Sequence, residues 1–291
     1  MAFEWLAWSN PVSVWWCFLV GMSTINIALW IWLKRKIDKM DFSIHPAGKY
    51  ILIVTKLSGA FAIGCAFRAV LPRADIQRIA LFDTWFSSIL LGRFVATVAE
   101  ICFALQWAIV LYYISKAAQS WISAKISYCI VPLIVIAEIF SWYAVITQNN
   151  FGSMIENSIW TMTFILIATA LLILYRSFYG RMRSIINVII AGIVLYIIFM
   201  YTVDLPMYFH RWQMDGQAGK QFLGFLKGLK DLNSHWVVTY NIALWRLEIP
   251  WMTLYFTTGV WASFILCYII LFQGKSGPKK KSRRLDNSSA Y

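Results

Sequence analysis

The chain has 291 residues, of which 60% are hydrophobic and 13% are charged, whereas soluble domains have about 45–50% apolar and about 25% charged residues. With a mean hydropathy of +0.64, 16 Trp and 20 Phe, the chain carries more apolar surface than a soluble core of this length can bury. These values exclude a soluble fold. The five cysteines lie in apolar stretches without C-x-x-C spacing, which excludes a disulfide or zinc framework.

Seven stretches are long and apolar enough to cross a bilayer core of roughly 30 Å, which needs about 20 helical residues. In chain order they cover residues 12–33, 50–70, 86–113, 126–146, 158–175, 185–203 and 250–272. The sequence therefore predicts an all-α integral membrane protein, with a seven-transmembrane-helix bundle in residues 1–274 and a basic tail in residues 275–291. The first ten residues lack a basic stretch and a cleavage site, so we expect the first span to be retained.

The basic residues are distributed unevenly between the two sides of this bundle. Sixteen Lys and Arg fall on the side of the carboxyl terminus and seven on the other side. By the positive-inside rule, the amino terminus is extracytoplasmic and the carboxyl terminus cytoplasmic. The tail KSGPKKKSRR explains part of the net charge of +13 and is expected to contact anionic lipids. Because no folded basic domain is present, nucleic acid is not an expected partner.

The longest connection, Asp204 to Ile249, is predicted to be an extracytoplasmic loop. Its stretch Phe222–Leu232 has apolar residues at helical spacing, with lysines elsewhere around the same turns. This pattern predicts an amphipathic helix that lies in the outer membrane interface. A lid packed on the ends of the bundle would bury the same apolar stripe, and the sequence does not distinguish the two.

Five arginines are predicted to gather at the extracytoplasmic ends of the spans and in the two outer loops. They are Arg68, Arg73, Arg78, Arg211 and Arg246. Arginine presents a planar donor fork that fits phosphate and carboxylate, so such a rim is a candidate site for an anionic lipid headgroup. The alternative is a solvated set of salt bridges with the neighbouring carboxylates.

Four ionisable residues fall inside the predicted spans, where charges are costly and face partners or cavities. At about 1.5 Å per residue, Lys56 is predicted to reach Glu100, and Arg93 to reach Glu138. Two such pairs would lock the second, third and fourth spans together. A proton or ion path would also place these groups near the middle of the membrane.

The long loop also holds the candidate catalytic residues. They are His210, His235, Asp204, Asp231 and Glu248, with no role assigned to any of them. A Ser234–His235 pair beside Asp231 suggests a hydrolase only weakly, because such triads are built by tertiary contact. A metal is not predicted, since His210, His235 and Asp215 are only weak candidate ligands without diagnostic spacing. The sequence assigns no cofactor.

Three functions are compatible with this pattern. The first is a membrane protein whose extracytoplasmic arginines bind an anionic lipid or lipid-linked headgroup, either as a binding protein or as an enzyme acting on it. The second is an ion-coupled carrier that uses Arg93, Glu100 and Glu138. The third is a non-enzymatic subunit or assembly factor of a membrane complex. A rhodopsin-like retinal site is excluded, because the last span contains no lysine.

Overall fold

The computed structural model describes residues 10–40 and 47–275. Seven of its helical segments are long and apolar enough to cross a membrane, which confirms the all-α seven-helix bundle. The individual helices are α1 (Pro11–Asp38), α2 (Gly48–Val70), α3 (Ile89–Ala117), α4 (Trp121–Thr147), α5 (Asn150–Leu174), α6 (Gly180–Phe199), α7 (Leu205–Gln217), α10 (Ile249–Leu254) and α11 (Val260–Lys275). The predicted basic tail lies almost entirely outside the described residues.

Polar side chains fix the start of four spans. Asn10, Ser88, Ser120 and Asn149 each accept a hydrogen bond from a backbone amide in the first turn of α1, α3, α4 and α5, respectively. These amides have no partner within their own helix. The caps explain why α5 begins at Asn150, eight residues before the start predicted from hydropathy alone.

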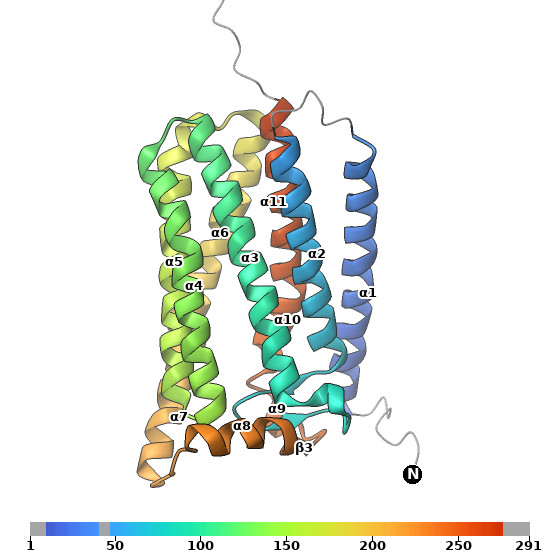
Figure 1. The fold of residues 1–291 in the computed structure, drawn as a ribbon, viewed down its shortest axis with the longest axis vertical. Helices are drawn as coiled ribbons and strands as arrows, with labels where there is room; N and C mark the ends of the chain where they lie inside the picture. Colours follow the sequence, from blue (N-terminus) through green and yellow to red (C-terminus); the bar gives the residue numbers. More distant parts are fainter. Residues whose placement is uncertain (1–9, 41–46, 276–291) are drawn as a thin grey trace, which may run out of the picture.

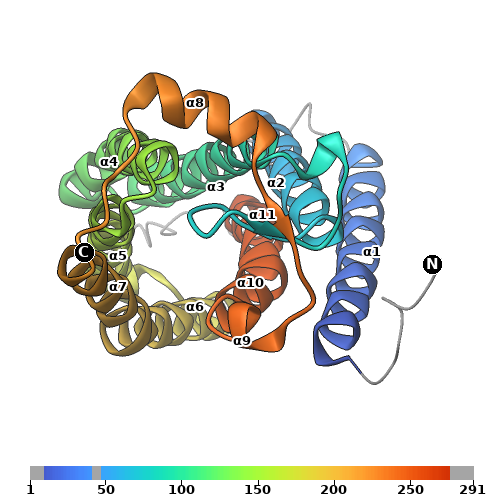
Figure 2. The ribbon, with the colours of Figure 1, turned by 90° about the horizontal axis from the view of Figure 1, so that it is seen from below.

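The helices enclose a central space (Figure 2). In this view α3, α4, α5, α6, α10 and α11 surround it, while α2 packs behind α3 and α11, and α1 packs behind α2. Gly64 on α2 allows a close approach to α3, because a Cβ atom at this position would lie 2.8 Å from the Cβ of Ala99. The bundle is therefore tightly packed between α2 and α3, and its other helices line a central cavity.

The sixth span is longer than predicted. A π-helical segment, η4 (Met200–Asp204), joins α6 to α7, so that one helical unit runs from Gly180 to Gln217. The predicted loop from Asp204 to Ile249 is wrong in its first third for this reason. Pro206 lacks an amide donor, but it lies in the first turn of α7 directly after the wide π turn, where the helix tolerates its absence. A second π segment, η5 (Tyr255–Gly259), joins α10 to α11.

Short elements cover one end of the bundle, which we call the capped end (Figure 1). Strands β1 (Arg73–Ala74) and β2 (Ile79–Ala80) form an antiparallel hairpin, and β3 (Val237–Val238) pairs in parallel with β2. The 3₁₀ turn η2 (Trp85–Ser87) leads into α3, and α9 (Ile242–Trp245) precedes α10. At the opposite end, the 3₁₀ turn η3 (Tyr175–Ser177) separates α5 from α6.

Helix α8 (Phe225–Ser234) lies across the capped end and overlaps the predicted helical stretch Phe222–Leu232, beginning three residues and ending two residues later. Leu229 and Leu232 pack with buried residues of α3 and α4. Gly228 allows a close contact with the backbone of Ile146, because a Cβ atom at position 228 would lie only 2.2 Å from the carbonyl oxygen of Ile146. Phe225 and Leu226 remain 63% and 76% exposed. One face of α8 is thus packed as a lid, and two apolar side chains remain uncovered.

Candidate functional site

The central space holds a cavity of about 520 Å³. Near the capped end its wall is polar, formed by the β1–β2 hairpin, α2, α3 and α5. Further along the bundle the wall becomes apolar and aromatic, with Trp107, Phe164, Ile193 and Ile265. At about 1.5 Å per residue, the wall formed by α10, η5 and α11 from Glu248 to Ile265 is roughly 25 Å long. One cavity therefore joins a polar end to a long apolar end.

The apolar part of the cavity opens sideways. Val188 and Leu195 on α6, Leu254 on α10 and Trp261 on α11 line the cavity and are also exposed on the outside of the bundle. Figure 2 shows α6 next to α10 and α11 at the edge of the central space. Because these helices belong to membrane-spanning segments, the opening between them faces the region occupied by lipid.

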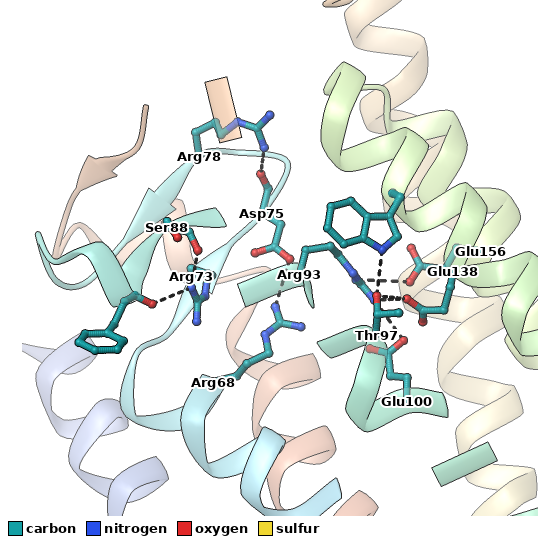
Figure 3. A network of polar contacts seen from close by, with 12 residues as sticks. Arg68, Arg73, Asp75, Arg78, Ser88, Arg93, Thr97, Glu100, Glu138 and Glu156 are labelled. Atoms are coloured by element: carbon teal, nitrogen blue, oxygen red, sulfur yellow. Dashed lines mark hydrogen bonds and ion pairs between the residues drawn. The ribbon is translucent and has the colours of Figure 1, made fainter. Parts of the chain in front are cut away.

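Four charged residues meet beside the polar part of the cavity, and we call them the Arg93 cluster (Figure 3). The Nη2 atom of Arg93 lies 3.2 Å from Glu100 Oε2 and 2.9 Å from Glu138 Oε2, and its Nη1 atom lies 3.8 Å from Glu156 Oε1. The four side chains come from α3, α4 and α5, and all are almost completely buried from solvent. The predicted pairing of Arg93 with Glu138 is confirmed.

The members of this cluster differ in their surroundings. Glu138 also accepts a hydrogen bond of 2.5 Å from Thr97 Oγ1, which in turn accepts one of 3.1 Å from Trp142 Nε1. Glu100 and Glu156 line the cavity, whereas Glu138 lies behind Arg93 and does not. The Arg93–Glu138 pair, held by the hydrogen bond from Thr97, thus links α3 to α4. The carboxyls of Glu100 and Glu156 face the cavity.

The predicted partnership of Lys56 with Glu100 is wrong. Lys56 is exposed on the surface of α2, and the ion pairs within residues 10–40 and 47–275 join Glu100 to Arg93 only. The depth estimate placed the two residues at similar heights, but a hydropathy pattern does not fix the rotation of α2 about its axis. Gly64, about two turns further along α2, faces α3 instead.

Glu156 is the site residue that the sequence analysis missed. Hydropathy placed the start of the fifth span at residue 158, which left Glu156 in a connecting loop. The polar positions Gly152, Ser153, Glu156 and Asn157 recur at helical spacing, and Asn149 is a suitable cap for a helix that contains them. These two signals together would have placed Glu156 on the inner face of α5.

Two of the five predicted arginines line the cavity, namely Arg68 and Arg73. Arg68 Nη2 lies 3.4 Å from Asp75 Oδ2. Arg73 is held through Nη1, which donates to the carbonyl oxygens of Phe86 at 3.1 Å and Ser88 at 2.6 Å. Its Nε and Nη2 atoms are buried without a hydrogen-bond partner, and in the described residues no carboxylate forms an ion pair with it.

Arg73 is consequently a buried cation that lacks a counter-charge in direct contact. Burial lowers the pKa of the Arg73 guanidinium to about 10. The attraction of Asp75 opposes this shift, and the neighbouring positive charge of Arg68 adds to it. The group remains charged at neutral pH. The guanidinium lies over Gly92, where a Cβ atom would be only 2.2 Å from Cζ, so the glycine provides the space for it.

The other three predicted arginines lie outside the cavity. Arg78 ties the hairpin to its neighbours, since it donates to Asp231 Oδ2 at 2.8 Å and to the carbonyl oxygen of Val145 at 2.8 Å. Arg211 pairs with Glu248 at 2.9 Å, and Arg246 is exposed. The predicted rim is therefore reduced to Arg68 and Arg73, because salt bridges and backbone contacts hold Arg78 and Arg211 elsewhere and Arg246 is exposed outside the cavity.

The five candidate catalytic residues do not meet at one site: Asp231 and His235 form one pair, and Asp204 lies near Glu248. Asp204 is buried and accepts a hydrogen bond of 2.5 Å from Asn157, and Glu248 pairs with Arg211. His210 and His235 are both exposed. The Nδ1 atom of His235 faces both Ser234 at 2.9 Å and Asp231 at 3.3 Å. A relay needs both ring nitrogens, so this trio does not form a hydrolase triad.

The three weak candidate metal ligands, His210, His235 and Asp215, do not form a cluster among the described residues. Asp215 contacts Lys220 and Asn150. In the part of the chain that the structure describes, one group of three metal-ligating side chains has its ligand atoms within 4.8 Å of one another, and it consists of Glu100, Glu138 and Glu156. Arg93 contacts all three of these carboxyls, so a guanidinium already supplies the positive charge that a metal ion would bring.

Comparisons with protein-family models, with curated proteins and with solved structures give no match for this chain. Its function is therefore argued from the cavity alone.

Proposed function

We propose that this integral membrane protein binds, in its central cavity, an amphiphile whose headgroup contains an anionic group such as a phosphate or carboxylate. The observation that carries the proposal is the continuity of one cavity, from the buried Arg73 to the apolar opening between α6 and α11. A lipid has this distribution of polarity along its length. Ligand sites in proteins are commonly concave, mostly apolar and supplied with a few convergent polar groups.

The headgroup would lie near Arg68 and Arg73. Arg73 offers two unpartnered N–H donors on adjacent atoms, Nε and Nη2, and this pair of donors matches two oxygens of a phosphate or carboxylate. Arg68 is the second cation on the wall. A bound anion would supply the directly contacting counter-charge that the described residues do not provide for Arg73.

The hydrocarbon chain would leave the cavity between α6 and α11, so that the ligand can enter from the membrane without crossing water. The basic-residue bias of the sequence supports an orientation with the capped end extracytoplasmic. The exposed Phe225 and Leu226 on α8 suit contact with the membrane interface at the capped end.

Native mass spectrometry of the protein purified in mild detergent tests this function. The wild type should retain a phospholipid, and Arg73→Gln should lose it, because the neutral side chain does not compensate the phosphate charge. Arg246→Gln is the matched control, since it removes an exposed arginine outside the cavity. Equal lipid retention by the wild type and Arg73→Gln, with both folded, would contradict the proposed site.

A further inference from the structure

The charges around the cavity remain unbalanced after the close ion pairs are matched. Arg68 pairs with Asp75, and Arg93 pairs most closely with Glu138. Among the described residues, Arg93 is the only cation that forms an ion pair with Glu100 and Glu156, at 3.2 Å and 3.8 Å. At the other end of the polar wall, no carboxylate of the described residues forms an ion pair with Arg73. A surplus cation and two surplus carboxyls thus face one cavity.

The three carboxyls of the Arg93 cluster share a single guanidinium, so the fully ionised cluster would carry two net negative charges. Isolated charges are expensive at membrane depth, and they are found with partners or in cavities. A proton can neutralise one carboxyl. The second requires another proton or a cation that enters the cavity.

From this arrangement we infer that the headgroup bound in the cavity is zwitterionic, with a primary ammonium at Glu100 and Glu156 and a phosphate at Arg73. The inference rests on the proposed function and specifies its ligand. It assigns Glu100 and Glu156 as binding residues, whereas Arg93 and Glu138 form the structural pair behind them.

The order of the charges along the wall fits such a headgroup. Figure 3 shows Arg73 on one side, Arg68 with Asp75 in the middle and the Arg93 cluster on the other side. Asp75 presents a buried acceptor atom, Oδ1, that has no hydrogen-bond partner, and it too lines the cavity. The anionic and cationic groups of a ligand would each meet the opposite charge.

The chemistry of the acidic side favours a primary ammonium over a quaternary one. A primary ammonium donates three hydrogen bonds, and hydrogen bonds to ionised carboxylates are among the strong ones. Phe103 on α3 and Trp160 on α5 lie about one helical turn from Glu100 and Glu156, respectively, and line the same cavity. One face of the Phe103 ring is already stacked on Phe61, with 4.5 Å between the ring centroids, which leaves less aromatic surface for a quaternary ammonium, the group that aromatic cages recognise.

The test compares lipids with identical acyl chains and different headgroups. The purified full chain is offered phosphatidylethanolamine and phosphatidylglycerol in detergent, and bound lipid is counted by native mass spectrometry. Both lipids carry the phosphate for Arg73, but only the first carries an ammonium. We expect the wild type to favour phosphatidylethanolamine by about tenfold or more, as a charged hydrogen bond would give.

Single substitutions test which residues cause the preference for phosphatidylethanolamine. Glu100→Gln and Glu156→Gln should each lose the preference for phosphatidylethanolamine while still binding phosphatidylglycerol, and Arg73→Gln should lose both lipids. Asp215→Asn, which alters a carboxylate outside the cavity wall, should behave as the wild type. Retention of the full preference by Glu100→Gln and Glu156→Gln would overturn the assignment of these residues.

A second measurement uses the wild type alone and so does not depend on the folding of a variant. Stepwise N-methylation of phosphatidylethanolamine removes hydrogen-bond donors and keeps the charge, so binding should fall with each methyl group. Equal binding of phosphatidylethanolamine and phosphatidylglycerol would overturn this inference but leave the proposed function intact. Binding of neither lipid would overturn both.

Discussion

Arg93 is the residue that connects most of the polar interior. Its guanidinium contacts carboxyls from α3, α4 and α5, and its Nε atom is buried without a hydrogen-bond partner. Breaking a buried ion pair leaves its partner uncompensated in a medium of low polarity, which is far more costly than losing an exposed pair. Arg93 is therefore expected to matter for stability as well as for the charge of the cavity.

A double-mutant cycle on Arg93→Met and Glu138→Leu measures this link. Each single change should lower the free energy of unfolding in mixed micelles by about 3–5 kcal/mol, and the double change should cost less than the sum. Lys56→Met, on the exposed face of α2, should cost less than about 0.5 kcal/mol. Strict additivity of the two single effects would show that Arg93 and Glu138 are not partners.

The space over Gly92 gives a second prediction at the residue scale. Gly92→Ala would place a Cβ atom 2.2 Å from Arg73 Cζ, so the guanidinium must move. The amount of phospholipid that copurifies with the protein should then fall several-fold. Gly21→Ala is the matched control, because nothing lies within 4 Å of its Cβ position. Unchanged retention by Gly92→Ala would argue against Arg73 as the anion ligand.

Among the elements, α6 forms the least buried wall of the cavity. Only 17% of the apolar window in its span is buried, compared with 50% for α2 and α3. It joins α7 through the π segment η4, and α10 joins α11 through η5, so both walls of the side opening contain a π turn. Such turns often occur at functional sites. The opening between α6 and the α10–α11 segment is therefore the feature to test by mutation.

Filling this opening should exclude the ligand. Gly192 on α6 lines the cavity and has nothing within 4 Å of its Cβ position, so Gly192→Phe should place a ring in the opening without a clash. We expect retained lipid to fall markedly in native mass spectra while the thermal unfolding temperature stays near that of the wild type. Gly21→Phe on α1 controls for an added ring on the lipid-facing surface, and equal lipid loss from both variants would contradict a specific opening.

The elements also show how far the sequence alone could lead. Hydropathy located all seven spans, because about 20 apolar residues per crossing is a strong signal. It misplaced the start of α5 and the end of the sixth span, where polar residues continue a helix. It also did not reveal the rotation of each helix, so Lys56 was assigned to the interior and Glu156 was overlooked. The ion pair between Arg78 and Asp231 joins residues far apart in the chain, so hydropathy could not predict it either.

For the molecule as a whole, the two ends of the bundle differ in structure and in charge. The hairpin, α8 and α9 cover one end, while the sequence places most basic residues at the other. The positive-inside rule then predicts an extracytoplasmic capped end. In a cysteine-free background, Ser234→Cys at the capped end should react with an impermeant thiol reagent in intact cells, and Ser184→Cys at the opposite end should react only after permeabilisation. The reverse pattern would contradict this orientation.

The central claim is that a lipid occupies the cavity with its chain between α6 and α11. A phospholipid with a photoreactive group on its acyl chain, crosslinked to the purified protein and mapped by peptide mass spectrometry, tests this most directly. We predict crosslinks to cavity-lining residues such as Ile193 and Ile265, lost when unlabelled lipid competes and in Arg73→Gln. Crosslinks confined to outward-facing residues such as Phe18 and Ile139, unaffected by competition, would contradict the account.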